Sequence, residues 1–353
     1  MNRAEHSTSS VLLAQDSDAE RWDTFVSSQS DALFFHRYDW KPLIEGTYGH
    51  KGYYLWVQRA KEVAGILPLF LFKGKLGHRC LISVPQADYA GVCAVDHEAR
   101  DVLLEAALKL AKDLSAQYVE LRHLGLGLDH LPSNDTRVAP LLLLPDSKEG
   151  LWKQLSNKMR NQVRKAQKSN VSVRHAQADE TRAFWRVFVA NMRRLGSPSP
   201  PQAFFSAILR HFQSDAALLV ATLNDRVIGG LLCLFHGGTI EVPWASSLPE
   251  YFHLCPNNAL YWEAMCVAID RGCTLLHFGS SPVGSGTYHF KMQWGAEAVP
   301  LRFQYLKNTS LPPLGDRQER LSYKVFRTVW RKLPLAVTNR LGPVINRKGK
   351  SPP

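Results

Sequence analysis

A lysine between two aromatic residues follows a small-residue loop late in the chain. Tyr288, Lys291 and Trp294 recur every three residues, so one helical turn would place the ammonium group between two rings. The loop before them contains Gly284 and Gly286, which permit positive φ angles and close approach of the backbone to a ligand. A positioned cation beside such a loop can stabilise an oxyanion or bind an anion. The pattern predicts an anion site, with an ordinary strand, loop and turn as the alternative.

The elements expected around this loop occur twice along the chain. Each half contains a hairpin, then a helix, then a short apolar strand. The expected ranges are 53–72, 101–114 and 118–122 in the first half, and 218–235, 257–271 and 274–278 in the second. The repeat predicts two copies of one α/β unit.

A basic helix is expected between the two copies, at residues 151–169. An apolar residue recurs every three or four positions, which gives the helix one packing face. Lys158, Arg160 and Arg164 fall outside this face. Because the arginine fork binds phosphate or carboxylate bidentately, Arg160 and Arg164 are the candidate pair for a diphosphate-linked acceptor, with Lys158 beside them. A solvated basic surface is the alternative.

The net charge of +12 is concentrated in two segments. Residues 151–175 contain seven Lys and Arg and no acid, and residues 315–353 contain ten Lys and Arg against two acids. This distribution favours phosphate-bearing partners such as tRNA, a nucleotide-linked or lipid-linked precursor, or an anionic membrane surface. Solvated charged faces are the alternative for each segment.

Composition argues against a membrane-spanning, a secreted or a metal-binding protein. No run of 18 apolar residues occurs, and the first 20 residues lack an apolar core of signal-peptide length, which predicts a cytoplasmic protein. The six cysteines show no C-x-x-C spacing, so buried thiols are expected and no metal site. Apolar residues at helical spacing in 320–333 predict a C-terminal helix that either folds back on the first domain or lies at an anionic membrane.

Several sequence segments resemble those of the FemAB-like transferases. The motif that carries the resemblance is FG followed by GSGTYxFKxxWGxE and then P-L. Within that family, the sequence is similar in particular to the branch associated with exosortase and PEP-CTERM exopolysaccharide loci. Further matching runs bring it to about residues 36–343: VAGILPLF, SVPQADYAG, SNKMRNQVRKAQK, PNNALYWEAM and the segment from Tyr323. The resemblance implies an α/β fold of two tandem GNAT-like domains with mixed sheets, plus a C-terminal helix.

Combining the repeat with the resemblance predicts five segments. These are a flexible N-terminus at 1–30, a first GNAT-like domain at 31–150, the basic connecting helix at 151–175, a second GNAT-like domain at 176–310, and a basic C-terminal helix and tail at 311–353.

The resemblance also implies roles for particular residues. In Fem-like enzymes the Phe-Lys pair of this motif lines the site where the aminoacyl-tRNA end meets the acceptor, and Phe290 and Lys291 match it. The family pattern places the helix start with Asn258 against the cleft, although a helix cap is the alternative. From their residue types alone, Glu263 and Tyr288 are weak candidates to accept a proton, with core or cap roles as the alternative. Tyr89, in the SVPQADYAG run, is a candidate substrate contact.

One four-residue segment departs from the family. The usual DFGR is His277-Phe278-Gly279-Ser280 here, so an acid and a base are missing. We expect either a changed pocket or a compensating pair elsewhere in the chain.

The transferred group is left open between two donors. The letters from Arg122 to Gly127 match a CoA pyrophosphate turn, but the next residues do not begin a helix. Aminoacyl-tRNA is therefore favoured over acyl-CoA as the co-substrate, and no permanently bound cofactor is expected. The predicted activity is N-acyl or aminoacyl transfer to an amine of a phosphorylated or lipid-linked cell-envelope glycan precursor in exopolysaccharide synthesis. The alternatives are a peptidoglycan cross-bridge aminoacyltransferase and a non-catalytic protein that binds glycan precursors. tRNA and peripheral contact with the inner membrane complete the expected partners.

Overall fold

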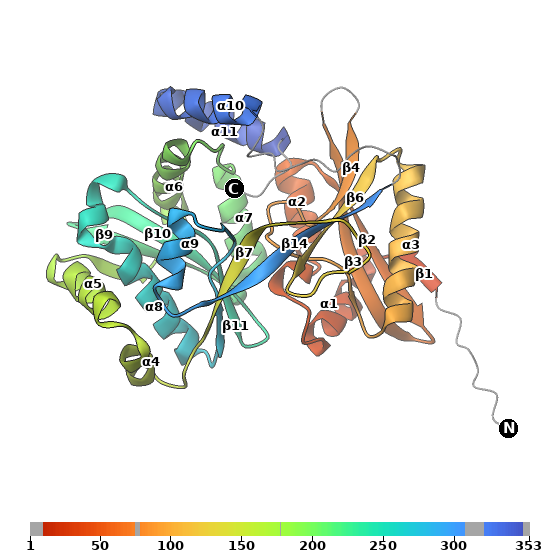
Figure 1. Cartoon of the computed structure of the whole chain (residues 1–353), viewed down its shortest axis with the longest axis horizontal. Helices are drawn as coiled ribbons and strands as arrows, with labels where there is room; N and C mark the ends of the chain where they lie inside the picture. The colour runs from red at the N-terminus through yellow and green to blue at the C-terminus, as the bar shows by residue number, and fades with distance from the viewer. Residues whose placement is uncertain (1–9, 75–77, 177, 308–320, 349–353) are drawn as a thin grey trace. The chain divides into compact units, whose positions relative to one another are not determined.

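The computed structural model describes residues 10–74, 78–176, 178–307 and 321–348 (Figure 1). The chain forms two compact units. Among the described residues, the first unit contains 10–135 and 301–307, and the second contains 136–300 and 321–348.

The first unit is built on a mixed sheet with the order β1-β2-β3-β4-β6-β14. Its strands are β1 (Ser10–Leu13), β2 (Lys51–Arg59), β3 (Glu62–Lys73), β4 (Arg79–Ser83), β6 (Tyr118–Leu124) and β14 (Glu297–Lys307), and the short β5 (Cys93–Ala94) pairs with β3. Its α-helices are α1 (Ala19–Ser28), α2 (Trp40–Tyr48) and α3 (His97–Asp113). β4 and β6 are parallel and the other neighbours are antiparallel. The apolar face of α3 packs against β2, β3 and β6 in one core, which buries this face of the helix and the strand residues beneath it.

The second unit repeats this arrangement with the order β8-β9-β10-β11-β12-β7. Its strands are β7 (Ser133–Leu143), β8 (Ser172–His175), β9 (Ala216–Leu223), β10 (Arg226–His236), β11 (Thr239–Ser247) and β12 (Leu275–His277), and the short β13 (Ser281–Pro282) pairs with β7. Its α-helices are α4 (Lys148–Gln154), α5 (Asn157–Lys168), α6 (Thr181–Leu195), α7 (Gln202–Phe212), α8 (Pro256–Asp270), α9 (Gly286–Met292), α10 (Leu321–Lys332) and α11 (Leu335–Lys348). β11 and β12 are parallel, as β4 and β6 are. The hairpin, helix and strand therefore recur in both units, as predicted.

In each unit, one strand follows the other copy in sequence. β7 comes directly after β6, yet it pairs with β12, with Leu141 opposite His277. β14 comes after α9, yet it pairs with β6, with Phe303 opposite Arg122. The observed division consequently differs from the predicted boundaries, because residues 136–150 belong to the second unit and 301–307 to the first.

The described part of the N-terminus is folded, so the predicted flexible segment 1–30 is wrong from residue 10 onward. Residues 10–13 form β1 on β2, and α1 buries Trp22, whose Nε1 donates to the carbonyl of His36 at 2.7 Å. The sequence signal for this helix is weak because only Trp22, Phe25 and Val26 are buried. Residues 1–9 lie outside the described part of the chain.

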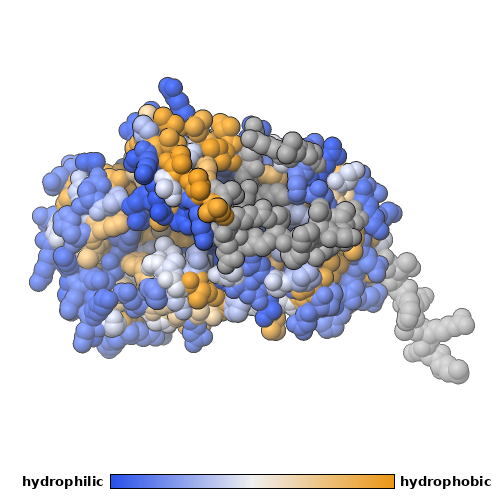
Figure 2. Space-filling model, turned by 45° about the horizontal axis from the view of Figure 1, so that its top comes forward, coloured by the Kyte–Doolittle hydropathy of each residue, from blue (hydrophilic) through white to orange (hydrophobic). Residues whose placement is uncertain are grey.

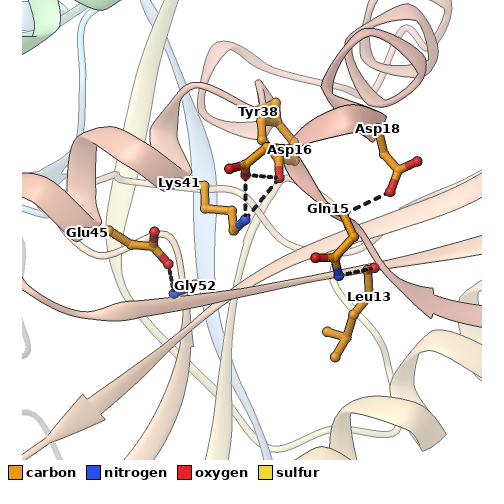
Figure 3. Close-up of polar contacts among 8 residues, drawn as sticks. All are labelled: Leu13, Gln15, Asp16, Asp18, Tyr38, Lys41, Glu45 and Gly52. Carbon is orange, nitrogen blue, oxygen red and sulfur yellow. Dashed lines mark hydrogen bonds and ion pairs between the residues drawn. The ribbon is translucent and has the colours of Figure 1, made fainter.

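Polar contacts fix the start of this segment as well (Figure 3). Lys41 Nζ donates to Asp16 Oδ1 and to the Tyr38 hydroxyl, each at 3.0 Å, and the Tyr38 hydroxyl donates to the same carboxylate at 3.0 Å. The hydrogen bonds from Lys41 and Tyr38 hold the pKa of Asp16 below its usual value. The turn between β1 and α1 is thus tied to the residues before and within α2.

The basic connecting segment is two helices rather than one. α4 ends at Gln154 and α5 begins at Asn157, with the Ser156 hydroxyl accepting a hydrogen bond from the Met159 amide at 3.3 Å. The predicted apolar face is nevertheless buried along both helices: Leu151, Leu155, Met159, Val163 and Ala166. A serine N-cap therefore bends the chain without changing which side packs.

The C-terminal segment also contains two helices where one was predicted. α10 ends at Lys332, and α11 continues from Leu335 to Lys348 after Pro334. Proline stops the first helix and is tolerated just before the second. Residues 311–320 and 349–353 of the predicted tail lie outside the described chain.

The cysteines are free thiols, as expected, and the described helices lack the features of a membrane span. Five of the six cysteines are buried and Cys255 is half-buried, and all six are free thiols. Burial raises the pKa of Cys93 and of Cys266 to about 12, which keeps both thiols protonated. In the described part of the chain, no helix is long and apolar enough to cross a membrane.

Truncating Trp22 tests whether α1 belongs to the folded first unit. We expect Trp22→Ala to lower the free energy of unfolding by about 3–5 kcal/mol, because a fully buried ring and its hydrogen bond are lost. Urea denaturation measures the change. Glu20→Ala, at an exposed position of the same helix, should change it by less than about 0.5 kcal/mol. Equal effects of the two changes would contradict a packed N-terminal helix.

Candidate active site

Lys291 is held inside the second unit by backbone oxygens. It lies on α9, and its side chain is 8% exposed. Its Nζ donates to the carbonyl of Gly279 at 2.9 Å and to that of Ser280 at 3.1 Å. The predicted lysine at the loop is therefore a buried cation whose position is set by the loop that follows β12.

Gly279 gives the loop the shape that receives this ammonium group. Its φ of +72° lies in the left-handed region, where glycine is favoured. Its amide donates to His277 Nδ1 at 3.0 Å, so the last residue of β12 braces the turn. α9 then begins at Gly286, with the Ser285 hydroxyl accepting a hydrogen bond from the Tyr288 amide at 3.1 Å.

A basic and an acidic residue from neighbouring strands lie at the segment that departs from the family pattern. Arg137, on β7, donates from Nη2 to the Ser280 hydroxyl at 2.7 Å. Glu241, on β11, is the register partner of His277, and both side chains are only 2% exposed. A basic and an acidic residue thus lie beside this segment, and the compensating pair stays a prediction. Neither Arg137 nor Glu241 was singled out from the sequence, because each is distant in sequence from the loop.

Aromatic packing fixes α9 against α8. The Tyr261 ring lies 5.3 Å from Phe278, 5.5 Å from Phe290 and 6.3 Å from Trp294, measured between ring centroids. Burial raises the pKa of Tyr261 far above its usual value, so its hydroxyl stays protonated. Phe290 and Trp294 thus position the helix that carries Lys291, and Tyr261 is a positioning residue that the sequence did not reveal.

The other residues predicted to contact substrate lie just before α9 and in its first turn. Gly284 has a φ of +73°, and a methyl group added at Gly284 or Gly286 would meet no atom of the chain within 4 Å. Tyr288 is half-buried, with its ring edge-to-face against His289 at 5.3 Å. The backbone at these positions is therefore open to a ligand.

The two candidates on α8 have different surroundings. Asn258 is buried, and its Nδ2 donates to Gln162 Oε1 of α5 at 3.0 Å, so it joins the two helices instead of capping α8. Glu263 lies further along α8, close enough to Cys266 and to Lys148 to act electrostatically on both. The structure thus connects Asn258 to the basic helix and places Glu263 towards α4.

The basic helix presents its cations as predicted, but two of them already make contacts. Arg160 donates to Asn157 Oδ1 at 2.6 Å, and the guanidinium of Arg164 lies 5.1 Å from the centre of the Trp152 ring. Lys158 is exposed. Arginine stacked on an aromatic ring keeps its edge available to an anion, so this helix remains a candidate phosphate-binding face.

Tyr89 lies in the first unit, apart from this set. It is 1% exposed, and its ring packs edge-to-face against Phe35 at 5.5 Å. These are the surroundings of a core residue.

In the first unit, the loop after β6 is filled by a side chain of β14. Gln304 accepts a hydrogen bond from the Leu128 amide at 2.8 Å and donates to the Leu128 carbonyl at 2.7 Å. A side chain at Gly127 would lie 2.6 Å from Gln304 Oε1, so the glycine accommodates Gln304. Arg122 is buried and paired with Glu120 at 2.8 Å. The segment whose letters match a pyrophosphate turn is therefore occupied by the protein itself.

The described chain offers no metal site. Among the residues with defined positions, no group of three or more His, Cys, Asp or Glu side chains is arranged to hold an ion.

Comparison with known proteins supports the fold. Residues 153–292 match the model of the acetyltransferase (GNAT) domain family, and this segment includes Lys291. The chain is similar to the crystal structure of FemX, with a TM-score of 0.66 and 17% identity over 85% of this chain and 98% of FemX. None of the curated proteins matches the sequence significantly.

Two further solved structures share the architecture. A tandem GNAT protein from the clavulanic acid biosynthesis pathway, solved without AcCoA, gives a TM-score of 0.53 with 10% identity over 86% of this chain and 99% of that protein. L-PGS from Bacillus licheniformis gives 0.50 with 10% identity over 83% of this chain and 96% of that protein. The predicted fold, two tandem GNAT-like units with C-terminal helices, is confirmed.

A half-buried histidine makes the Gln304 contact sensitive to pH. His123 Nδ1 lies 3.0 Å from Gln304 Oε1, and its Nε2 accepts from the Val92 amide at 3.2 Å. Desolvation of the imidazole lowers the pKa of His123 to about 4, although the Gln304 hydrogen bond acts in the opposite direction. An unfolded histidine binds its proton near pH 6.5, so stability is full above that pH and is lost as the pH falls towards 4. We expect a loss of about 3 kcal/mol across this range.

Urea denaturation at pH 7, 5.5 and 4 measures this dependence. In His123→Gln, the part of the slope due to this histidine should disappear, whereas the exposed His253→Gln should keep it. An unchanged slope in His123→Gln would show that His123 is not the group being protonated.

Proposed function

We propose that the protein is an N-acyltransferase or aminoacyltransferase whose active site lies in the second unit, at Lys291. The observation that carries the proposal is the buried ammonium group held by the carbonyls of Gly279 and Ser280. It lies within the segment that matches the GNAT acetyltransferase family. The resemblance of Phe290-Lys291 to the Phe-Lys pair of Fem-like enzymes supports the same position.

The reaction is direct attack of an amine on an activated acyl group. The amine nitrogen bonds to the acyl carbon, the ester or thioester bond breaks, and the leaving oxygen or sulfur takes the electron pair. The proton released by the amine passes to the leaving group or to solvent. The fixed charges of Lys291 and Arg137 lie at the loop and stabilise negative charge on the carbonyl oxygen during this step.

Aminoacyl-tRNA is the donor that the contacts favour. The glycine segment of the first unit resembles a CoA pyrophosphate turn in sequence. The Gln304 side chain, however, occupies the space beside it. Another glycine pair, Gly229 and Gly230, lies within β10, and a side chain at Gly229 would meet Ser247 Oγ at 2.5 Å, so it offers no phosphate turn either. The exposed lysines of α5 that are not assigned to the acceptor, Lys165 and Lys168, suit RNA phosphates.

The acceptor in this proposal is an amine on a phosphorylated or lipid-linked glycan precursor of the cell envelope. The sequence resemblance to the branch associated with exosortase and PEP-CTERM loci favours an exopolysaccharide precursor over a peptidoglycan precursor as the acceptor. Arg160 and Arg164 of α5 would bind its diphosphate, and Gly284, Gly286 and Tyr288 would border the acceptor at the start of α9.

Transfer assays with Lys291→Met test the activity. The purified protein is incubated with a charged minihelix RNA or acetyl-CoA and with amino-sugar nucleotides, and product is followed by mass spectrometry. We expect kcat to fall about 10²–10³-fold, because one fixed charge at a developing oxyanion is lost. Lys148→Met, an exposed lysine paired with Asp270, should retain full activity.

Donor binding separates the enzyme from a non-catalytic binder. A donor that raises the melting temperature of the wild type but not of Lys291→Met supports the site. If no donor is turned over, and anionic glycans stabilise both proteins equally, the enzyme proposal fails and the binding alternative replaces it.

A further inference from the structure

The last two helices expose rows of large apolar side chains. On α10, Leu321, Val325 and Val329 recur every four residues and are 77%, 55% and 52% exposed. On α11, Leu341 and Val344 continue the pattern at 44% and 52%. A contiguous exposed apolar patch on a soluble protein marks an interaction surface.

The rows are specific to this part of the molecule. Of the fourteen exposed large apolar side chains in the described chain, seven lie on α10 and α11. Figure 2 shows apolar surface gathered where these helices lie, with hydrophilic surface beside it. The scattered exposed residues elsewhere form no comparable set, so this surface requires its own explanation.

The opposite faces of the helices are fixed to the second unit. Trp330 of α10 is buried, and Arg327 donates to the Leu195 carbonyl at the end of α6 at 3.1 Å. Arg193 of α6 donates in return to the Leu333 carbonyl. On α11, Thr338 is buried. One face therefore packs on α6 of the second unit, whereas packing on the first domain was predicted. This packing presents the apolar rows in a fixed orientation.

Cations border both rows, and acids are absent. Residues 321–348 contain no Asp or Glu, and five of their basic side chains are exposed: Lys324, Arg331, Lys332, Arg340 and Arg347. At 100° per residue, the apolar row of each helix lies between the packed face and the main group of cations. An apolar strip beside a cationic strip is the pattern of helices that lie in a membrane interface.

We propose that α10 and α11 form a docking surface for an anionic phospholipid bilayer. The apolar rows enter the boundary between headgroups and acyl chains, and the bordering cations bind lipid phosphates. A second copy of this chain fits less well, because a two-fold contact would bring the same cationic strips together without a compensating acid. The proposal does not depend on acyl transfer.

Vesicle flotation tests this surface in the full-length protein. Vesicles of phosphatidylcholine alone are compared with equal mixtures of phosphatidylcholine and phosphatidylglycerol. We expect binding to the mixed vesicles that weakens with added salt, and little binding to phosphatidylcholine alone. Val325→Asp, Val329→Asp and Leu341→Asp combined should lower the partition coefficient at least about tenfold.

Two further variants separate the contributions. Val95→Asp, which changes an apolar residue of the first unit that is 50% exposed, should bind as the wild type does. Lys324→Gln, Lys332→Gln and Arg340→Gln combined should also lower binding at least about tenfold. Circular dichroism and melting temperature check that each variant is folded.

Three outcomes would overturn the proposal. The wild type fails to bind the mixed vesicles at low salt, or the folded triple aspartate variant binds them as well as the wild type. The third is a concentration-dependent dimer in sedimentation that the triple aspartate variant loses, with no vesicle binding, which would assign the surface to a second copy. Transfer activity towards soluble acceptors is unaffected in each case, so failure here leaves the enzyme proposal standing.

Discussion

An ammonium group withdrawn from water is the constraint on which the organisation of the second unit depends. Burying a charge is costly unless fixed dipoles or opposite charges replace its hydration. Two carbonyls of the loop after β12 do so for Lys291, and this requires the left-handed conformation of Gly279. It also requires that α9 cannot move away, which the rings around Tyr261 ensure. Loop, helix and aromatic cluster are thus parts of one positioned cation.

The exchange of β7 and β14 between the two copies connects this site to the order of the chain. β7 comes directly after β6 of the first copy in sequence and supplies Arg137 to the loop of the second, where it binds Ser280. Glu241 arrives from β11 beside His277. A basic and an acidic residue thus reach the segment 277–280 from separate strands, each placed by strand pairing and not by the local sequence.

The two copies have diverged at equivalent loops. After β6, the Gln304 side chain fills the turn and His123 beside it remains neutral, whereas after β12 the carbonyls of the loop bind a lysine. In the first unit, the polar groups of the loop are therefore hydrogen-bonded within the protein. In the second unit, the loop holds a positive charge and is bordered by exposed glycines. The duplicated fold accommodates these two different loops because the packing of strands and helices away from the loops is the same in both units. This asymmetry is why the proposed chemistry is assigned to the second unit.

The sequence by itself determined the repeated hairpin, helix and strand, and the lysine on a helix after a glycine loop. These follow from local periodicity and turn preferences, which act over a few residues. Only the tertiary structure decided that β7 and β14 each pair with a strand of the other copy, that Arg137 and Glu241 lie beside the loop, and that the Gln304 side chain occupies the space next to Gly127. Those pairings join residues far apart in sequence, from a few tens of positions for Glu241 and His277 to more than 100 for the others. Their energies depend on which surfaces are buried together. No local pattern records that information.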